Sequence, residues 1–137
     1  MITRILALGA IGLAVLGGCG TAPATTIGPG PTDGVTRVEL QRSPAPAQGF
    51  EIVQTRVEIP EGKESGRHSH PGPEVGYIVQ GDVVIEFADR EPLRLRTGDP
   101  FLIPAGVVHN ARNVGTVRTQ MLSTYVIDQA KPLVTRH

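Results

Sequence analysis

Three histidines and one glutamate stand where their side chains could share a single site. His68 and His70 are two residues apart, and on a β-strand such residues point to the same face with Cα atoms ~6.6 Å apart. The Pro-Gly-Pro segment 71–73 then reverses the chain, so Glu74 begins the next strand and can face the pair. His109 lies far along the chain, and we expect it at the end of another strand. Three imidazole nitrogens and one carboxylate oxygen suit Mn, Fe, Co, Ni, Cu or Zn better than Ca or Mg.

The ordinary alternative for an isolated His-x-His tripeptide is a surface pair on an edge strand. An enzyme would also need an acid or base apart from its metal ligands. By strand parity we expect Gln80 to share the face of Glu74, and Tyr77 and Arg67 to point outward. The interior that remains would be mostly apolar, which suits an apolar or aromatic ligand. The polar and large side chains near the site strands are Arg56, Arg67, Tyr77, Gln80, Met121, Ser123 and Tyr125.

The elements that must position these residues are short β-strands. Apolar residues alternate with polar ones in 51–59, 83–87 and 93–96, which is the period of half-buried strands. Turns rich in Pro and Gly recur about every ten residues, a spacing typical of a sandwich or barrel. No ten-residue helical pattern occurs in residues 35–137, so we expect one all-β domain.

Composition excludes several classes of protein. The 137 residues include 13 Lys+Arg and 13 Asp+Glu, and a balanced charge disfavours nucleic acid, whose binding needs clustered cations. Aromatic residues make up 4% and Trp is absent, so no stacking platform for bases is available. With 17 Gly and 12 Pro, a large helical bundle is excluded. Because Cys19 is the single cysteine, neither an intrachain disulfide nor a cysteine-based metal site can form.

The first 19 residues read as an export signal. One cation is followed by an apolar run of 14 residues, 5–18, that ends at Cys19, and this run is shorter than the ~20 residues of a membrane-spanning helix. The segment 16–19, Leu-Gly-Gly-Cys, resembles the lipobox of bacterial lipoproteins, which implies cleavage before Cys19 and its lipidation. An uncleaved anchor or an ordinary secretory peptide is the alternative. Residues 20–34 are small and rich in Pro and Gly, so we expect a disordered tether that leads to a domain over 35–137.

Two spaced motifs carry a second resemblance. The residues between and around the candidate ligands match both motifs of the cupin superfamily at every fixed position, and the likeness covers residues from about 48 to 128. The two motifs read Gly62-x5-His68-x-His70-x3-Glu74-x6-Gly81 and Gly98-x5-Pro104-x-Gly106-x2-His109-x3-Asn113.

The cupin resemblance implies a single-domain jelly-roll barrel, the double-stranded β-helix. It implies one divalent transition metal ion, of a kind left open among Mn, Fe, Ni, Cu and Zn, with His68, His70, Glu74 and His109 as ligands. Asn113 would be structural. The implied activity is that of a dioxygenase-like oxidoreductase on a small organic substrate, with Glu74 also accepting the substrate proton. The alternative is a module that binds a small ligand or the metal without catalysis.

Small cupins commonly dimerise, and the edges of an all-β domain need covering. We expect a homodimer in which Val35, Val38 and Leu40 cover a neighbouring copy. The equally weighted alternative is a strand that covers its own barrel.

Overall fold

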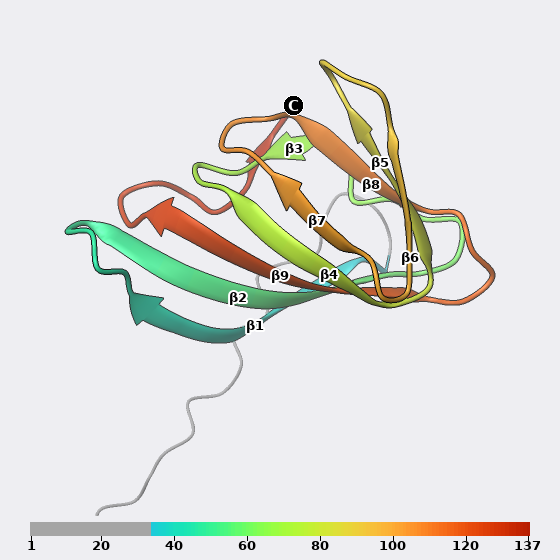
Figure 1. Ribbon diagram of the computed structural model, residues 1–137, viewed down its shortest axis with the longest axis horizontal. Helices are drawn as coiled ribbons and strands as arrows, with labels where there is room; N and C mark the ends of the chain where they lie inside the picture. Colours follow the sequence, from blue (N-terminus) through green and yellow to red (C-terminus); the bar gives the residue numbers. More distant parts are fainter. Residues whose placement is uncertain (1–33) are drawn as a thin grey trace, which may run out of the picture.

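The computed structural model describes residues 34–137, which form ten β-strands and no helix. The strands make two five-stranded antiparallel sheets that face each other (Figure 1), with orders β1-β2-β9-β4-β7 and β10-β3-β8-β5-β6. The expected all-β class is therefore confirmed. In this part of the chain no helix is long and apolar enough to cross a membrane. The strands are β1 (Thr36–Pro44), β2 (Phe50–Ile59), β3 (His68–Ser69), β4 (Glu74–Gln80), β5 (Asp82–Phe87), β6 (Leu93–Arg96), β7 (Pro100–Ile103), β8 (His109–Asn113), β9 (Thr119–Asp128) and β10 (Thr135–Arg136).

The alternation of side chains explains how the first sheet buries one face. In β2 the residues Val53, Thr55, Val57 and Ile59 are buried and their neighbours are more exposed, as the period of two requires. β2 pairs with β9 over its whole length, and β9 shows the same alternation. The apolar side chains of the two sheets pack against each other in the space between them, and most belong to one cluster: Val35, Val57, Ile59, Ile78, Val83, Ile85, Leu95, Phe101, Ile103, Ala111 and Met121.

The structure corrects two of the strand positions that we expected near the site. His109 is the first residue of β8, not the end of a strand, because the chain leaves the turn after Ile103 and pairs only from His109 onward. Gln80 is exposed and does not share the face of Glu74, because the β4–β9 register shifts between Ile78 and Gln80.

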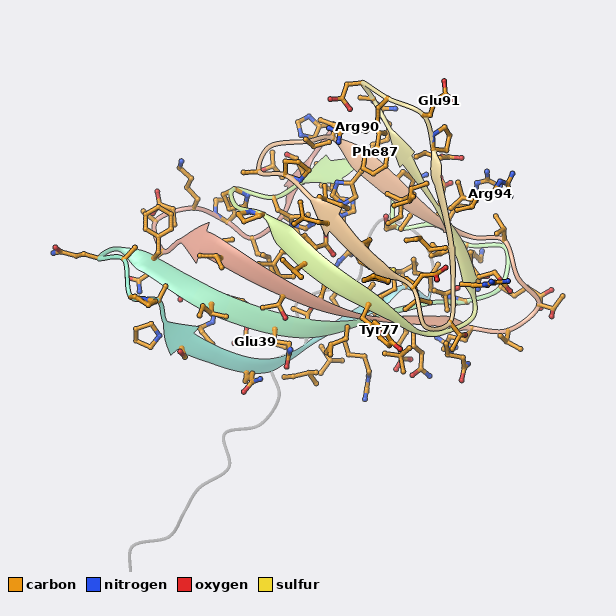
Figure 2. The ribbon with its side chains drawn as sticks, viewed as in Figure 1. Glu39, Tyr77, Phe87, Arg90, Glu91 and Arg94 are labelled. Carbon is orange, nitrogen blue, oxygen red and sulfur yellow. The ribbon has the colours of Figure 1, made fainter. Side chains whose placement is uncertain are left out.

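Other orientations agree with the sequence. Glu74 begins β4 and is buried. Tyr77 is 48% exposed, and Figure 2 draws it on the side of β4 that faces away from the other sheet. Arg67 is also exposed.

The N-terminal strand lies on its own sheet. β1 is the edge strand and pairs with β2 of the same chain. Val35 belongs to the core at 1% exposure, whereas Leu40 is 46% exposed. Val35 therefore covers its own domain, and the homodimer stays a prediction that the mass of the protein in solution can test. Cys19 and the expected signal peptide lie outside the described residues.

Gly72 lies against the backbone of β9, so we predict that Gly72→Ala is strongly destabilising. A Cβ at this position would lie 1.7 Å from the carbonyl oxygen of Val126, and backbone must move to relieve that overlap. We expect the free energy of unfolding to fall by about 3 kcal/mol in urea denaturation.

Gly115→Ala is the matched control. Its Cβ would lie 3.1 Å from the Asp82 carboxylate oxygen and 3.3 Å from the Asp82 Cβ; the exposed carboxylate can turn away, and a shift of a few tenths of an ångström relieves the second contact. We expect a loss below about 1 kcal/mol. Equal stabilities of the two variants would contradict the close packing of the 70–74 turn on β9.

Candidate metal centre

Strand pairing in the second sheet brings the three imidazoles together. His68 in β3 stands directly opposite His109 in β8, and His70 follows two residues after His68 on the same side. The ring centroids are 4.3 to 5.3 Å apart, and all three side chains are buried. One ring nitrogen from each lies within 4.8 Å of the others. Two nitrogens bound to one tetrahedral zinc ion would be ~3.4 Å apart, so the group is somewhat wider than an occupied coordination sphere.

Backbone carbonyls orient each ring. Nδ1 of His68 lies 2.7 Å from the carbonyl oxygen of Gly66, Nδ1 of His70 lies 2.7 Å from that of Leu133, and Nδ1 of His109 lies 2.9 Å from that of Val107. A carbonyl oxygen can only accept, so Nδ1 donates in each case. In the neutral rings the lone pair is therefore on Nε2, and a hydrogen-bonded Nδ1–H of this kind is typical of histidines that bind a metal through Nε2.

Glu74 reaches the imidazoles from the opposite sheet. Its Oε2 lies 3.3 Å from Nε2 of His70 and 3.6 Å from Nε2 of His109. Its Oε1 accepts a hydrogen bond of 3.1 Å from the hydroxyl of Tyr125, the residue opposite Glu74 in the β4–β9 register. The Tyr125 ring also packs against the ring of His70, with centroids 4.6 Å apart.

Two buried atoms in this group have no hydrogen-bond partner among the described residues, namely Nε2 of His70 and Oε2 of Glu74. They lie 3.3 Å apart, and a neutral imidazole and a carboxylate both present electron pairs there. Buried polar atoms are nearly always satisfied. A cation with soft-to-borderline character satisfies both at once, so the residues fit a transition metal ion.

Electrostatics favour the ligating forms. Burial, together with the nearby charge of His109, lowers the pKa of His68 to about 3, so this imidazole is neutral at pH 7. Burial alone would raise the pKa of Glu74, but hydrogen bonds and positive charge from His109 and His70, which these rings supply when they are protonated, hold the pKa well below its usual value. Glu74 is therefore a carboxylate. Burial, and next the charge of Glu74, raises the pKa of Tyr125, so its hydroxyl keeps the proton that it donates to Glu74.

A small cavity adjoins the centre between the two sheets. The volume open to the centre of a water-sized molecule is about 10 Å³, which is room for about one water. Six apolar and six polar residues line it. The lining consists of Val57, Ile85, Phe101, Ile103, Ala111 and Met121 with the polar residues Arg37, Ser65, His68, Glu74, His109 and Tyr125.

The structure brings together all four residues that the sequence singled out, and it places Asn113 in a structural role. Asn113 Nδ2 donates to the carbonyl oxygens of Ile59 and Val117, and its Oδ1 accepts from the backbone of Gly115. The fourth histidine, His137, lies outside the centre and contacts Ser69 Oγ at 2.9 Å.

Sequence reasoning missed Arg37 and gave no role to Tyr125. A period of two from buried Val35 would have placed Arg37 on the inner face, but charged residues are rarely assigned to a core. The role of Tyr125 depends on its register opposite Glu74, which the sequence does not contain.

The lowered pKa of His68 predicts how the metal-free protein responds to acid. In the unfolded state His68 takes up a proton below its ordinary pKa of about 6.5, whereas in the folded state it stays neutral down to about pH 3. The contribution of His68 to the free energy of unfolding is therefore fully present above pH 6.5 and is lost as the pH falls toward 3. The amide of His68→Asn can still donate to Gly66. As the pH falls, we expect the free energy of unfolding of this variant to decrease less steeply than that of the wild type, by up to about 1.4 kcal/mol per pH unit.

Urea denaturation of the chelated proteins across pH 4.5 to 8 measures this difference. Glu74 also has a lowered pKa, and its protonation in the unfolded state would reduce stability at lower pH. Measuring above pH 4.5 excludes this effect of Glu74 from the comparison. Above pH 7 the two curves should run parallel, which serves as an internal control. Identical slopes between pH 4.5 and 6.5 would show that His68 is not buried in its neutral form.

Known proteins resemble this chain in sequence and in fold. Germin-like protein subfamily T member 3 of Arabidopsis thaliana is 32% identical over 82 residues, which are 56% of this chain and 36% of that protein. The chain thus spans about a third of the length of this curated relative. A predicted oxalate decarboxylase of Thermotoga maritima superposes with a TM-score of 0.62 at 22% identity, covering 77% of this chain and 94% of the other.

The polyketide cyclase RemF of Streptomyces resistomycificus superposes with a TM-score of 0.64 at 18% identity, covering 83% of this chain and 80% of the other. At such identities these two structures show a shared fold alone. Residues 55–125, just over half of the chain, match the family described as the cupin domain. The chain belongs to the cupin domain family.

Proposed function

We propose that this protein is a metal-dependent cupin of the bacterial cell envelope that acts on a small organic substrate as a dioxygenase-like oxidoreductase. One divalent transition metal ion would be held by His68, His70, Glu74 and His109. The observation that carries the metal site is the pair of unsatisfied buried atoms, Nε2 of His70 and Oε2 of Glu74, in the middle of the donor group. The comparisons support this reading through the family, whose fold the chain shares.

The fold that we infer is the closed double-stranded β-helix. Support comes from the cavity, whose wall takes Val57 from β2 and Met121 from β9 on one sheet, and Ile85 from β5 and Ala111 from β8 on the other. Side chains of both sheets therefore enclose a common interior, as in a barrel.

Within that interior Glu74 has two separate tasks. Its Oε2 faces the imidazoles and its Oε1 is held by Tyr125. A carboxylate ligand can also accept a proton from a bound substrate, and the fixed hydroxyl of Tyr125 would keep the orientation of Glu74 during that transfer. A bound divalent ion would supply Lewis acidity toward a substrate oxygen.

The metal site is tested by metal analysis of the purified protein. We expect stoichiometric metal in the wild type and less than about a tenth of that in a His68→Ala/His109→Ala variant, because two of the four donors are gone. Ser69→Ala is the matched control, since it removes only the contact with His137 and should keep the metal. Stoichiometric metal in the double variant would place the ion elsewhere.

The alternative function is a module that binds a small ligand or the metal without catalysis. It differs from the proposed enzyme in that it turns over no substrate. Oxygen uptake by the metal-loaded protein against flavonoids, diketones, thiols and small organic acids separates the two. The enzyme proposal expects uptake that Glu74→Gln abolishes. Binding of a compound without any turnover would favour the module.

The envelope location rests on the sequence of residues 1–19, and we propose lipidation of Cys19 after cleavage. Two or more acyl chains would anchor the protein stably, whereas one would bind reversibly. Cys19→Ser should abolish lipid labelling and processing, measured by mass spectrometry of the N-terminus. An intact Met1 with unchanged detergent partitioning would instead show an uncleaved anchor.

A further inference from the structure

The ring of His70 is oriented in a different way from the other two imidazoles of the candidate metal centre. Nδ1 of His68 and Nδ1 of His109 each donate to a carbonyl oxygen two residues earlier in the chain. The segment that carries each of these rings therefore orients it. Nδ1 of His70 instead donates to the carbonyl oxygen of Leu133 at 2.7 Å, a residue 63 positions further along the chain. The orientation of His70 thus depends on a segment that is remote in sequence.

That segment is the chain end, residues 129–137, which we call the C-terminal strap. It begins after β9, a strand of the first sheet, and ends in β10, the edge strand of the second sheet. There Thr135 pairs with Ser69 and Arg136 with His68 of β3, and Figure 1 shows the chain end beside β3. The strap therefore runs from one sheet to the other next to the candidate ligands.

A single side chain anchors the strap in the interior. Within residues 129–137 only Leu133 is buried, with 9% exposure. It packs in a small apolar cluster that also contains Tyr125, whose hydroxyl binds Glu74 and whose ring packs against His70. One residue of the strap thus supplies both its anchor and the acceptor for His70.

The acceptor decides what His70 offers to an ion. A neutral imidazole carries its proton on either ring nitrogen, and the hydrogen bond that one nitrogen makes selects the tautomer. With Leu133 in place the proton is on Nδ1 and the lone pair is on Nε2, toward Glu74. A strap with one buried side chain and an edge strand of two residues is also a segment that opens at low free energy.

We propose that the C-terminal strap positions His70 for metal binding, with Leu133 as the positioning residue, so that docking of the strap and affinity for the ion are coupled. The docked strap holds Nε2 of His70 toward the ion, and the undocked strap frees the ring. The coupling is reciprocal, because an ion that binds the docked form more tightly must stabilise that form by the same factor. This inference rests on the proposed function, since it concerns the same metal centre.

Titration with Co²⁺, followed by its visible absorption, tests the proposal without any turnover. In Leu133→Ala the strap loses its anchor, so we expect the dissociation constant for Co²⁺ to rise about 10- to 100-fold, the usual effect of losing a partner that orients a ligand. Leu133→Met keeps the apolar contact and should restore the affinity. Wild-type affinity in Leu133→Ala would overturn the proposal.

Leu95→Ala is the matched control. Leu95 is also 9% exposed, but it belongs to the main core cluster and lies on β6, at the opposite edge of the second sheet from β10. The substitution removes the same atoms without touching the strap, so this variant should bind Co²⁺ like the wild type. Equal losses of affinity in Leu95→Ala and Leu133→Ala would mean that general loosening of the domain is the cause, and would contradict the proposal.

The metal-free protein gives a readout that a merely structural leucine would not change. With ¹⁵N-labelled histidine, NMR detects the Nδ1–H groups of the three rings, and the signal missing from His70→Gln identifies that of His70. In Leu133→Ala we expect the His70 signal to disappear and those of His68 and His109 to remain, because their acceptors are local. Persistence of the His70 signal would contradict the proposal.

Hydrogen exchange of the wild type needs no variant. Saturating Co²⁺ should slow the amides of residues 129–137 more than those of β6, because global stabilisation alone would slow both edges of the second sheet alike. Equal slowing would overturn the proposal. Co²⁺ binding that is independent of the strap refutes only this inference, whereas a wild type that binds no Co²⁺ refutes the proposed function.

Discussion

The structure depends on three imidazoles whose Nδ1 atoms are tied to backbone carbonyls. Because Gly66, Leu133 and Val107 accept those protons, each ring turns its other nitrogen toward the same small volume. Glu74 closes that volume from the facing sheet. The donor group therefore forms only when the two sheets are packed, so the candidate metal centre and the core are parts of one folding event, and a bound ion would stabilise the packed state.

The polar groups of the interior differ in how they are paired. Glu74 and Tyr125 form a closed pair that fixes the carboxylate toward the imidazoles. Within residues 34–137 Arg37 forms no salt bridge, and Glu39 on the same strand pairs with Arg42. The apolar walls strengthen the interactions of Glu74 with Tyr125 and the imidazoles, since charges attract more strongly where water is excluded.

Much of this was accessible from the sequence, because the cupin motifs combine short-range spacing with turn residues. Period-two alternation predicted the inner face of β2, and the Pro-Gly-Pro turn predicted that Glu74 would begin β4. The sequence predictions failed where the pairing of strands distant in the chain determines a residue's position. Gln80 turned outward because of a register shift against β9, and His109 opens its strand because its partners are distant. Arg37 escaped notice because its burial is set by β2 and the cavity, not by its own polarity.

The most direct test of the account is X-ray absorption spectroscopy of the metal-loaded protein at the edge of whichever ion it holds. Three imidazoles and one carboxylate predict a first shell of nitrogen and oxygen only, at about 2.0–2.2 Å if the ion is zinc, with the outer-shell scattering of three histidine rings. Scattering from one ring or none, or a shell of oxygen alone, would contradict the central claim that His68, His70, His109 and Glu74 hold the metal.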